Sequence, residues 1–349
     1  MRKVWMMCVF AITCAMLSTS TWAKDNAVIL LYHHVSNNTP KVTSVSPDTF
    51  YQHMQYLSDN HNVLPLEQVI IALQNNQPLP DKTVVITFDD GYGNIYDNAH
   101  PILKKFSFPY TIFVTPYLIG KASHQLNWKQ VNRMASENAS FANHGKQHNH
   151  LLSKHTEESR KDWLSRNMLD IEDAEKILEK KVGYSLQYFA YPYGEFDKHL
   201  KSQLRAQGYI GFAQHSGAIA SHSDFSALPR FPAAGIYSNI ETLKVKLDSL
   251  AMPVTVIYPD DPKVVLPVQN LTFTVKTEDV TPYQINCFQD GQILNDSLDG
   301  MTVSVQINPI TQPGRHRVNC TAPSNSEKGR FYWFSQPFFM PTDKGKWLD

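Results

Sequence analysis

The region from residue 27 to about residue 251 alternates short apolar, β-branched runs with longer segments of helical periodicity. The strand-like runs are residues 27–32, 83–88, 110–114, a short run ending at 141–142, and 188–190. The helix-like segments are residues 47–59, 66–74, 95–106, 157–182 and 198–207. Strands that alternate with helices over this length predict a parallel sheet, and the number of units suits an α/β barrel. In such folds, functional side chains gather at the carboxyl ends of the strands.

The pattern changes beyond about residue 252, where short β-branched segments are separated by turn residues and no helical periodicity is visible. These segments are residues 254–258, 271–276, 284–288, 301–307, 315–320 and 331–334. Asp290-Gly291 between two alternating runs predicts a hairpin. We therefore expect a small all-β domain, an immunoglobulin-like sandwich, over residues 253–349. The proline-rich stretch 253–267 would join it to a barrel domain over residues 24–252.

Residues 1–23 have the pattern of a secretory signal peptide. Met1-Arg2-Lys3 forms a charged start, an apolar run follows over residues 4–17, and small residues lead to Ala23. The apolar run is too short to span a membrane as a helix. We therefore expect cleavage near Ala23, no membrane span in the mature chain, and an exported protein that is periplasmic or secreted to the cell surface.

The chain that follows this segment is close to neutral and holds two cysteines. Without Arg2 and Lys3 it has 30 basic and 32 acidic residues, which does not favour a nucleic acid or an anionic membrane surface as a partner. Cys287 and Cys320 are its cysteines. Two cysteines in an exported chain predict one disulfide bond, here between strands that face or neighbour each other in the sandwich. Protein partners stay open.

The most informative single stretch is the apolar run 83–88, which ends abruptly at Asp89-Asp90-Gly91. The run is typical of a buried strand, and Gly91 is typical of the turn that ends it. Because side chains alternate along a strand, we expect Asp89 and Asp90 to face different surroundings, so that one can hold a metal while the other faces substrate or water. Taken alone, the pair also suits two solvated turn aspartates.

A second polar cluster follows the strand-like run that ends at 141–142. His144 and His148 have a spacing that lets two imidazoles bind one metal ion. Together with one aspartate they supply three ligands and leave a coordination position open, as in catalytic sites. Nitrogen and oxygen donors favour Zn²⁺ and leave Co²⁺, Ni²⁺ or, in an oxygenase, Fe²⁺ open. An exposed histidine-rich loop without a metal is the alternative.

Three motifs in order carry a family resemblance. TFDDG at 87–91, NHGKQHNHL at 143–151 and YPYG at 191–194 resemble the motifs of the polysaccharide deacetylases, the NodB-type carbohydrate esterases of family 4. The resemblance covers about residues 27–250 and implies a distorted (β/α) barrel of about seven parallel strands. It also implies metal-dependent hydrolysis of N-acetyl groups from an N-acetylglucosamine-containing polysaccharide, with release of acetate.

The resemblance further implies a role for each residue that matches the motifs. In that family the first aspartate of the pair is the general base, and the second binds the metal together with both histidines. Carried over, Asp89 is the base, and Asp90, His144 and His148 hold one divalent ion. The backbone N–H of Tyr193 would stabilise the oxyanion of the reaction.

Two positions depart from the family pattern. Gly145 stands where the family usually has Ser or Thr after the first metal histidine, and Ala190 stands where it usually has an arginine that orients the base. Whatever orients Asp89 must then come from elsewhere, and Arg230 is the candidate, with an ordinary surface cation in a loop as the alternative. His150 is expected to be a loop or supporting residue and not a ligand.

The late histidine motif of the family is also missing, since no histidine lies between His222 and His316. In this the chain is similar to exported poly-N-acetylglucosamine deacetylases, which begin with a strand ending in Tyr-His. Here the corresponding strand ends at Tyr32-His33-His34, and we expect His33 to donate the proton to the leaving amine. Alternation sends His33 and His34 to opposite faces, so His34 is the rival for this role.

Aromatic side chains near these motifs are candidates to contact sugar rings. They are Tyr92, Tyr191, Tyr193 and Trp128, each of which also suits an ordinary core or rim position. The aromatic run 331–334 invites a carbohydrate-binding interpretation as well, but a strand that buries one face explains it more simply.

We therefore expect a metal-dependent N-deacetylase whose partner is an acetylated amino-sugar polysaccharide. The alternatives are an O-acetyl esterase on acetylated xylan, a non-catalytic polysaccharide-binding protein that keeps the barrel, and a ferrous-iron oxygenase. The intact Asp89 argues against a pure binder, and the barrel pattern together with a second aspartate argues against the oxygenase. Poly-N-acetylglucosamine, chitin oligomers, peptidoglycan and acetylated xylan are all candidate substrates.

Overall fold

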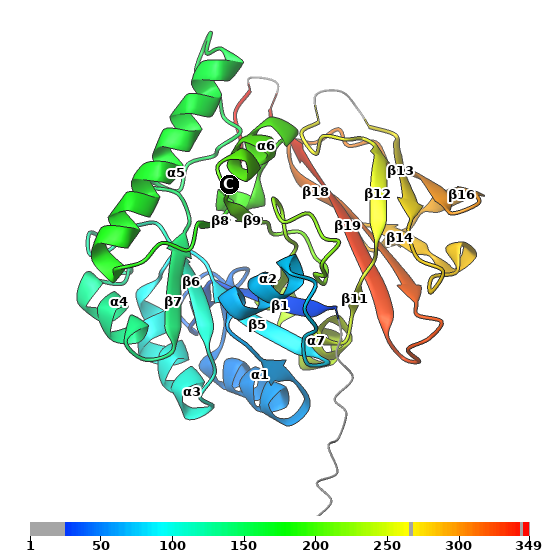
Figure 1. Cartoon of the computed structure of the whole chain (residues 1–349). Coiled ribbons are helices and arrows are strands. Elements are labelled where there is room, and N and C mark those ends of the chain that lie inside the picture. The colour runs from blue at the N-terminus through cyan, green and yellow to red at the C-terminus, as the bar shows by residue number, and fades with distance from the viewer. Residues whose placement is uncertain (1–24, 265–267, 343–344, 349) are drawn as a thin grey trace, which may run out of the picture.

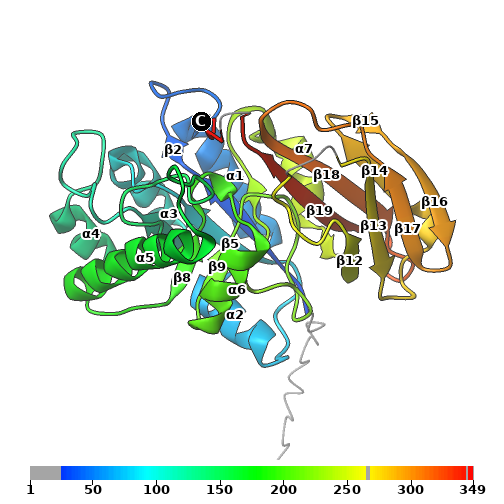
Figure 2. The same cartoon turned by 90° about the horizontal axis from the view of Figure 1, so that it is seen from above.

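The structure, a computed structural model, describes residues 25–264, 268–342 and 345–348. The expected signal peptide over residues 1–23 lies outside the described residues. Two domains lie side by side, a barrel surrounded by helices and a sandwich of strands (Figures 1 and 2). Every α-helix of the described residues belongs to the barrel domain.

The barrel domain is built on a parallel sheet, as the alternation of strands and helices predicts. Its strands follow the order β10-β1-β5-β6-β7-β8-β9, and each neighbouring pair is parallel. β1 and β5 are buried along their whole length, as expected for central strands covered on both faces. The strands are β1 (Ala27–Tyr32), β5 (Thr83–Phe88), β6 (Tyr110–Val114), β7 (Ala139–Asn143), β8 (Tyr188–Ala190), β9 (Ile210–Phe212) and β10 (Phe231–Pro232), with β4 (Asn62–Val63) paired to β5 and a separate ribbon of β2 (His34–Val35) and β3 (Ser44–Val45).

Helices cover the outside of this sheet (Figure 1). α1 has the predicted start, because Ser46 accepts a hydrogen bond from the backbone N–H of Thr49 and Pro47 occupies the first turn. α5 begins slightly later than predicted, at Arg160, because Ser159 caps it there. The sequence pattern missed α4 and α7, which are only 8 residues long each. The helices are α1 (Pro47–Asn60), α2 (Leu66–Gln74), a π-helical turn η1 (Ile95–Ala99) that leads into α3 (His100–Lys105), α4 (Trp128–Ala135), α5 (Arg160–Val182), α6 (Lys198–Ala206) and α7 (Ile240–Leu247), with 3-10 turns η2 (Pro192–Gly194) and η3 (Gly235–Tyr237).

The segment that leads into β10 closes the barrel between β9 and β1. Leu228 forms a parallel bridge to Phe212 of β9, and farther along the chain Phe231 pairs with Leu30 of β1. Arg230 lies between these two points of contact. The closure of the barrel therefore carries Arg230 to the wall that lies between the first and last strands.

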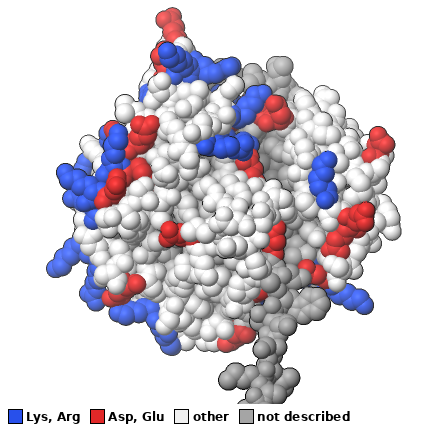
Figure 3. Space-filling model, in the orientation of Figure 1, with Lys and Arg blue, Asp and Glu red and all other residues white. Residues whose placement is uncertain are grey.

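The surface of the described residues agrees with the nearly balanced charge of the chain. On the face shown in Figure 3, basic and acidic side chains are interspersed, and uncharged residues cover most of the centre. This face therefore offers no continuous basic surface to a nucleic acid. Of the described helices, none combines the length and the apolar character needed to cross a membrane.

The second domain is a sandwich of two sheets, as the short alternating strands predict. One sheet has the order β11-β19-β18-β14-β15 and the other β12-β13-β17-β16. Residues such as Phe273, Val303 and Phe338 fill a common core, and Asp290-Gly291 forms the predicted hairpin with φ of +50° and +80°. The strands are β11 (Leu250–Ala251), β12 (Val254–Tyr258), β13 (Asn270–Val275), β14 (Asn286–Gln289), β15 (Gln292–Ile293), β16 (Asn295–Asp299), β17 (Thr302–Gln306), β18 (Gly314–Pro323) and β19 (Phe331–Met340), with a 3-10 turn η4 (Pro282–Gln284) before β14.

The two domains are joined by strand pairing as well as by side-chain packing. β11, at the end of the barrel domain, pairs in parallel with β19 at Tyr332 and Trp333. The ring of Trp333 lies 5.1 Å from that of Phe231 in the barrel, whereas Tyr332 and Phe334 pack on the core of the sandwich. The aromatic run 331–334 thus serves mainly to pack, which is the simpler of the two interpretations that the sequence allows.

Cys287 and Cys320 form the disulfide bond that the sequence predicts. They are direct cross-strand partners on β14 and β18, which are neighbouring strands of one sheet. The bond therefore differs from that of antibody domains, which joins the two sheets of the sandwich. It closes a loop with a sequence separation of 33 residues.

We expect loss of this bond to destabilise the sandwich by roughly 3–4 kcal/mol, because the bond restricts the unfolded chain across the loop that it closes. Calorimetry should show the melting transition of the sandwich at a lower temperature after reduction. A Cys287→Ser/Cys320→Ser variant, used as the control, should melt at the temperature of the reduced protein. Free-thiol titration of the unfolded, unreduced chain without residues 1–23 should find no thiol, and a result of two thiols per chain would refute the bond.

Candidate active site

The carboxyl end of β5 carries both aspartates, and they have different surroundings. Asp89 is fully buried, and its backbone N–H donates to the carbonyl of Tyr32 (3.0 Å). Asp90 lies on the turn that follows, in the left-handed region with φ +71°. Gly91 has φ +74°, and a Cβ there would lie 2.9 Å from Cγ1 of Val114, so that only glycine fits without displacing its neighbour. The turn therefore gives the two carboxylates different partners, as strand alternation predicts.

His144 and His148 lie on the loop that follows β7. Asn143, the last residue of β7, anchors this loop: its side-chain oxygen accepts the backbone N–H of Gly145 (2.8 Å), and its amide group donates to Glu175 of α5 (2.8 Å). Gly145 has φ +77° and His148 has φ +56°, so the backbone turns sharply at both positions. These turns bring the two imidazoles to the same side of the loop. Residues four apart would share one side in a helix, and here the turns have the same effect.

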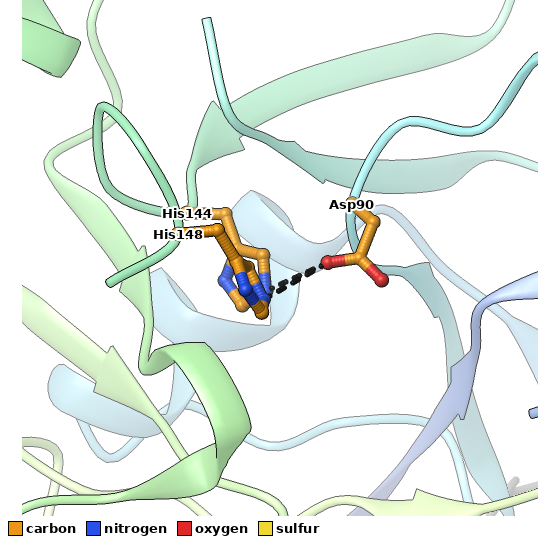
Figure 4. A group of neighbouring side chains, drawn as sticks. All are labelled: Asp90, His144 and His148. Carbon is orange, nitrogen blue, oxygen red and sulfur yellow. Dashed lines mark ion pairs between the residues drawn. The ribbon is translucent and has the colours of Figure 1, made fainter. Parts of the chain in front are cut away.

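Asp90, His144 and His148 converge at one point (Figure 4). Oδ1 of Asp90 lies 3.3 Å from Nε2 of His144 and 3.1 Å from Nε2 of His148. Among the described residues, these three offer ligand atoms that all lie within 4.8 Å of one another. His144 is buried, whereas Asp90 and His148 are partly exposed, so the cluster is open to solvent on one side.

The hydrogen bonding of His144 fits a metal ligand. Its Nδ1–H donates to the carbonyl of Ala190 (2.8 Å), which leaves Nε2 as the nitrogen with an unshared lone pair. That Nε2 is buried and has no hydrogen-bond partner among the described residues. A buried nitrogen in this state, next to a carboxylate oxygen and a second imidazole, suits a divalent cation such as Zn²⁺.

The charges of the cluster keep the carboxylate ionised. Burial raises the pKa of Asp90, but the adjacent imidazoles of His144 and His148 outweigh burial and hold that pKa well below its usual range. Burial lowers the pKa of His144, but the carboxylates of Asp89 and Asp90 raise it, and the net shift is upward. Protons and a metal ion therefore compete for the same imidazole.

Arg230 is fully buried and pairs with Asp89 through two hydrogen bonds. Nη1 donates to Oδ1 and Nη2 to Oδ2, each at 2.7 Å. Nε of Arg230 donates to the carbonyl of Ala213 (2.9 Å), and the guanidinium lies over the ring of Phe113 at 5.2 Å. Burial raises the pKa of Asp89, but Arg230 and His144 lower it, and the net shift is downward. Arg230 is thus a partner of Asp89 and not the surface cation of the alternative interpretation.

His33 and His34 follow β1 directly and lie near the aspartates. Burial lowers the pKa of His33, and the nearby carboxylates of Asp90 and Asp89 partly offset this shift. His34 stacks on the ring of Tyr92, with ring centroids 3.7 Å apart. Burial lowers the pKa of His34 to about 4, with Asp90 again acting in the opposite direction. Both imidazoles therefore lie in the field of Asp90, and His33 lies in that of Asp89 as well.

The aromatic candidates fall into two groups. Tyr191 is fully buried and its hydroxyl donates to the carbonyl of Ser226 (2.6 Å), so it is a core residue and the expectation of a sugar contact is wrong for it. Trp128 begins α4 and packs, partly buried, on the core of the barrel. Tyr92 and Tyr193 are partly exposed beside the cluster of Figure 4. These two tyrosines stay candidates for contact with a sugar ring.

Sequence reasoning missed Glu195, which follows the YPYG motif directly. Glu195 is almost fully buried, and its Oε2 lies 3.0 Å from Nδ1 of His150. His150 therefore has a carboxylate partner and stands apart from the ligand cluster, as expected. Its position in the sequence could have identified it, because Glu195 comes directly after the YPYG motif that follows β8.

Comparison with a family profile agrees with this geometry. The profile described as Polysaccharide deacetylase matches residues 76–211. The matched range contains both aspartates of the turn after β5, both histidines of the cluster and the YPYG motif, and it leaves Arg230 and His33 outside.

Known proteins similar to this chain carry related names. The poly-beta-1,6-N-acetyl-D-glucosamine N-deacetylase of Staphylococcus epidermidis is 26% identical over 229 residues, which cover 60% of this chain and 79% of that protein. The Escherichia coli protein of the same name is 25% identical over 253 residues, which cover 62% of this chain but only 38% of that protein.

Solved structures extend the likeness to the fold. The Streptococcus pyogenes deacetylase PplD, solved in complex with acetate, is 27% identical with a TM-score of 0.57, and the comparison covers 64% of this chain and 98% of that one. The structure of IcaB from Ammonifex degensii, at 23% identity and a TM-score of 0.55, shares the fold. Within its barrel domain, this chain therefore contains a region, residues 76–211, that matches the polysaccharide deacetylase family.

Proposed function

We propose that this protein hydrolyses N-acetyl groups of an N-acetylglucosamine-containing polysaccharide and releases acetate. The observation that carries the proposal is the convergence of Asp90, His144 and His148 next to the buried pair of Asp89 and Arg230. A metal-binding cluster beside a separate carboxylate supplies the two components that metal-assisted hydrolysis requires.

Asp90, His144 and His148 hold the divalent ion, which we assign as Zn²⁺ from the nitrogen and oxygen donors. When bound, such an ion acts as a Lewis acid that polarises the acetyl carbonyl and lowers the pKa of a water molecule. The hydrogen bond from Nδ1 of His144 to Ala190 fixes the ring so that Nε2 faces the ion. Co²⁺ and Ni²⁺ suit the same donor set.

Asp89 is the general base that takes the proton of the attacking water. Arg230 binds both of its carboxylate oxygens and fixes the direction of the carboxylate. In this arrangement Arg230 takes the place of the motif arginine that the family usually has where Ala190 stands here. The low pKa of Asp89 keeps it ready to accept a proton at neutral pH.

The remaining steps fall to Tyr193 and His33. The backbone N–H of Tyr193 donates to the oxyanion that forms as the acetyl carbonyl is attacked. His33 protonates the departing amine, because an amide anion is a very poor leaving group. Its position at the carboxyl end of β1, in the field of Asp89 and Asp90, supports this role.

The names of the two similar N-deacetylases support poly-β-1,6-N-acetylglucosamine as the substrate. The signal-like residues 1–23 support export of the protein, which would bring it to a compartment where it can reach such a polymer. O-acetylated xylan and binding without hydrolysis are the alternatives that the first experiment separates.

The first test measures acetate released from partially acetylated poly-N-acetylglucosamine, chitin oligomers, peptidoglycan and acetylated xylan. We expect release from the first of these, loss of release with a chelator, and recovery on addition of Zn²⁺. His148→Ala should lose both the metal and the activity, because it removes one of three protein ligands.

His150→Ala is the matched control for metal content, since His150 lies on the same loop but pairs with Glu195. It should retain one ion per chain by elemental analysis. Full activity in His148→Ala, or undiminished turnover after removal of the metal, would contradict the assignment. Acetate release from xylan alone would identify an esterase.

Asp89→Asn should bind metal but lose roughly two to four orders of magnitude in kcat, because it removes the base and no ligand. The change also leaves the buried guanidinium of Arg230 without its counter-charge, so we expect the free energy of unfolding to fall by up to about 3–5 kcal/mol. Metal content, kcat and melting temperature should be measured on the same preparation. A folded Asp89→Asn variant without bound metal would show that Asp89 is a ligand.

His33→Ala should keep the fold and the metal while kcat falls by roughly two to four orders of magnitude, the usual contribution of general acid catalysis. His34→Ala is the comparison, since His34 is the next residue along the chain but stacks on Tyr92. An active His33→Ala together with an inactive, metal-bound His34→Ala would mean that the proton comes from the other imidazole. If both variants are active, the acid lies elsewhere.

A further inference from the structure

Arg315 of the sandwich domain reaches the active site. Arg315, at the start of β18, lies with its guanidinium 5.5 Å from the centre of the Tyr193 ring in the barrel domain. Nη1 of Arg315 also donates to Oε1 of Glu195 at 3.3 Å and to the carbonyl of Leu348 at 3.2 Å. A pocket of about 230 Å³ opens beside this contact and is lined by residues of both domains, including Tyr193, Arg315 and Arg317.

Glu195 links Arg315 to the loop that carries the metal ligands. Its side chain is 1% exposed, and its two oxygens face different partners: Oε1 faces Arg315 and Oε2 faces Nδ1 of His150 at 3.0 Å. A carboxylate removed from water to this degree requires charged or hydrogen-bonding partners on each side. Arg315 and His150 supply them from two different domains.

His150 in turn sets the position of Tyr193. The two rings stack with centroids 3.9 Å apart and planes inclined by only 7°. The edge of the Tyr193 ring meets His148 at 4.6 Å with an angle of 64°. Tyr193 has φ +57°, a backbone conformation that a tyrosine adopts only when its surroundings impose it. The contacts around this ring are therefore expected to matter for the direction of its backbone N–H.

We propose that Arg315 is a positioning residue for the deacetylase site, which it supports from the second domain by holding Glu195, His150 and the ring of Tyr193 in place. The proposal rests on the proposed function, in which the backbone N–H of Tyr193 stabilises the oxyanion. In this proposal the sandwich contributes to catalysis, because it completes the wall of the site on the side of His148.

The chemistry of arginine is suited to this role. The planar guanidinium of an arginine can lie over an aromatic ring, and the N–H groups at its edge can bind a carboxylate at the same time. A lysine would keep the positive charge near Glu195 but would lose the contact of the guanidinium with the ring of Tyr193. Because a displacement of about 1 Å in an active site reduces the rate by up to about 100-fold, loss of this contact is expected to affect kcat.

The test compares Arg315→Ala, Arg315→Lys and the control Arg317→Ala in the full chain, with Zn²⁺ bound. Arg317 is the matched control because it lies on the same strand and lines the same pocket, but hydrogen-bonds to Tyr237 and has no contact with Glu195. Arg315→Ala should lower kcat by about tenfold, with KM within about twofold and one metal ion per chain. Arg315→Lys should lie between the wild type and Arg315→Ala, and Arg317→Ala should keep kcat within about twofold.

A double-mutant cycle tests whether Arg315 acts on the site through Glu195. Glu195→Gln and Arg315→Ala should each lower kcat, and the double variant should be no slower than the slower of the two, because both break the same connection. Independent, multiplying losses would overturn the proposal, as would an Arg315→Ala variant with wild-type kcat or one that alters KM alone. If Arg315→Ala does not fold, the same criteria apply to Arg315→Lys.

A readout independent of turnover separates this inference from the proposed function. In a crystal structure of Arg315→Ala, or of Arg315→Lys, we expect the ring of Tyr193 to leave its stack with His150. An unchanged stack would overturn the inference whatever the activity. Conversely, a wild-type protein that releases no acetate from any of the polymers would reject the proposed function, while this structural comparison would still decide whether Arg315 positions Tyr193.

Discussion

The buried pair of Asp89 and Arg230 is the interaction on which the barrel and its site both depend. Both side chains are excluded from solvent and joined by two hydrogen bonds of 2.7 Å. Arg230 lies on the segment that closes the barrel between β9 and β1, so the pair fixes this closure while it directs the carboxylate. Removing one partner would leave a buried charge uncompensated, at a cost of about 3–5 kcal/mol. Barrel closure and the orientation of the Asp89 carboxylate are therefore parts of one structural requirement.

Around this pair, the residues assigned to the chemistry lie in unusual backbone conformations. Asp90, His148 and Tyr193 all have positive φ, at +71°, +56° and +57°. Each such conformation costs on the order of 1–3 kcal/mol for a residue with a side chain and persists only where the surroundings impose it. Here the surroundings are the turn at Gly91, the loop anchored by Asn143, and the stack of Tyr193 with His150. The site is held in shape by packing and hydrogen bonds around it.

The sandwich contributes to that packing. β11 pairs with β19 across the boundary, and Trp333 packs on Phe231 directly after Arg230. Arg315 extends from the same sheet to Glu195 and Tyr193. The sandwich thus contacts the wall of the candidate site at two places, one behind Asp89 and one beside His148. Through these contacts a domain without a ligand cluster of its own among the described residues packs against a site formed by the other.

The sequence by itself determined the parallel barrel, the all-β second domain and the disulfide, because these follow from periodicity, turn residues and the cysteine count. From their spacing it indicated His144 and His148 as ligands, and from the resemblance to the polysaccharide deacetylases it took Asp90 rather than Asp89 as the third. It also named Arg230, but left open whether that arginine was a surface cation. Only the tertiary structure decided this, since Asp89 and Arg230 are far apart in the chain and meet because the barrel closes. The same holds for the burial of Tyr191 and for the contact of Arg315 with Glu195. Such contacts leave no periodic signal, because their partners come from different elements or domains, and only the folded chain brings them together.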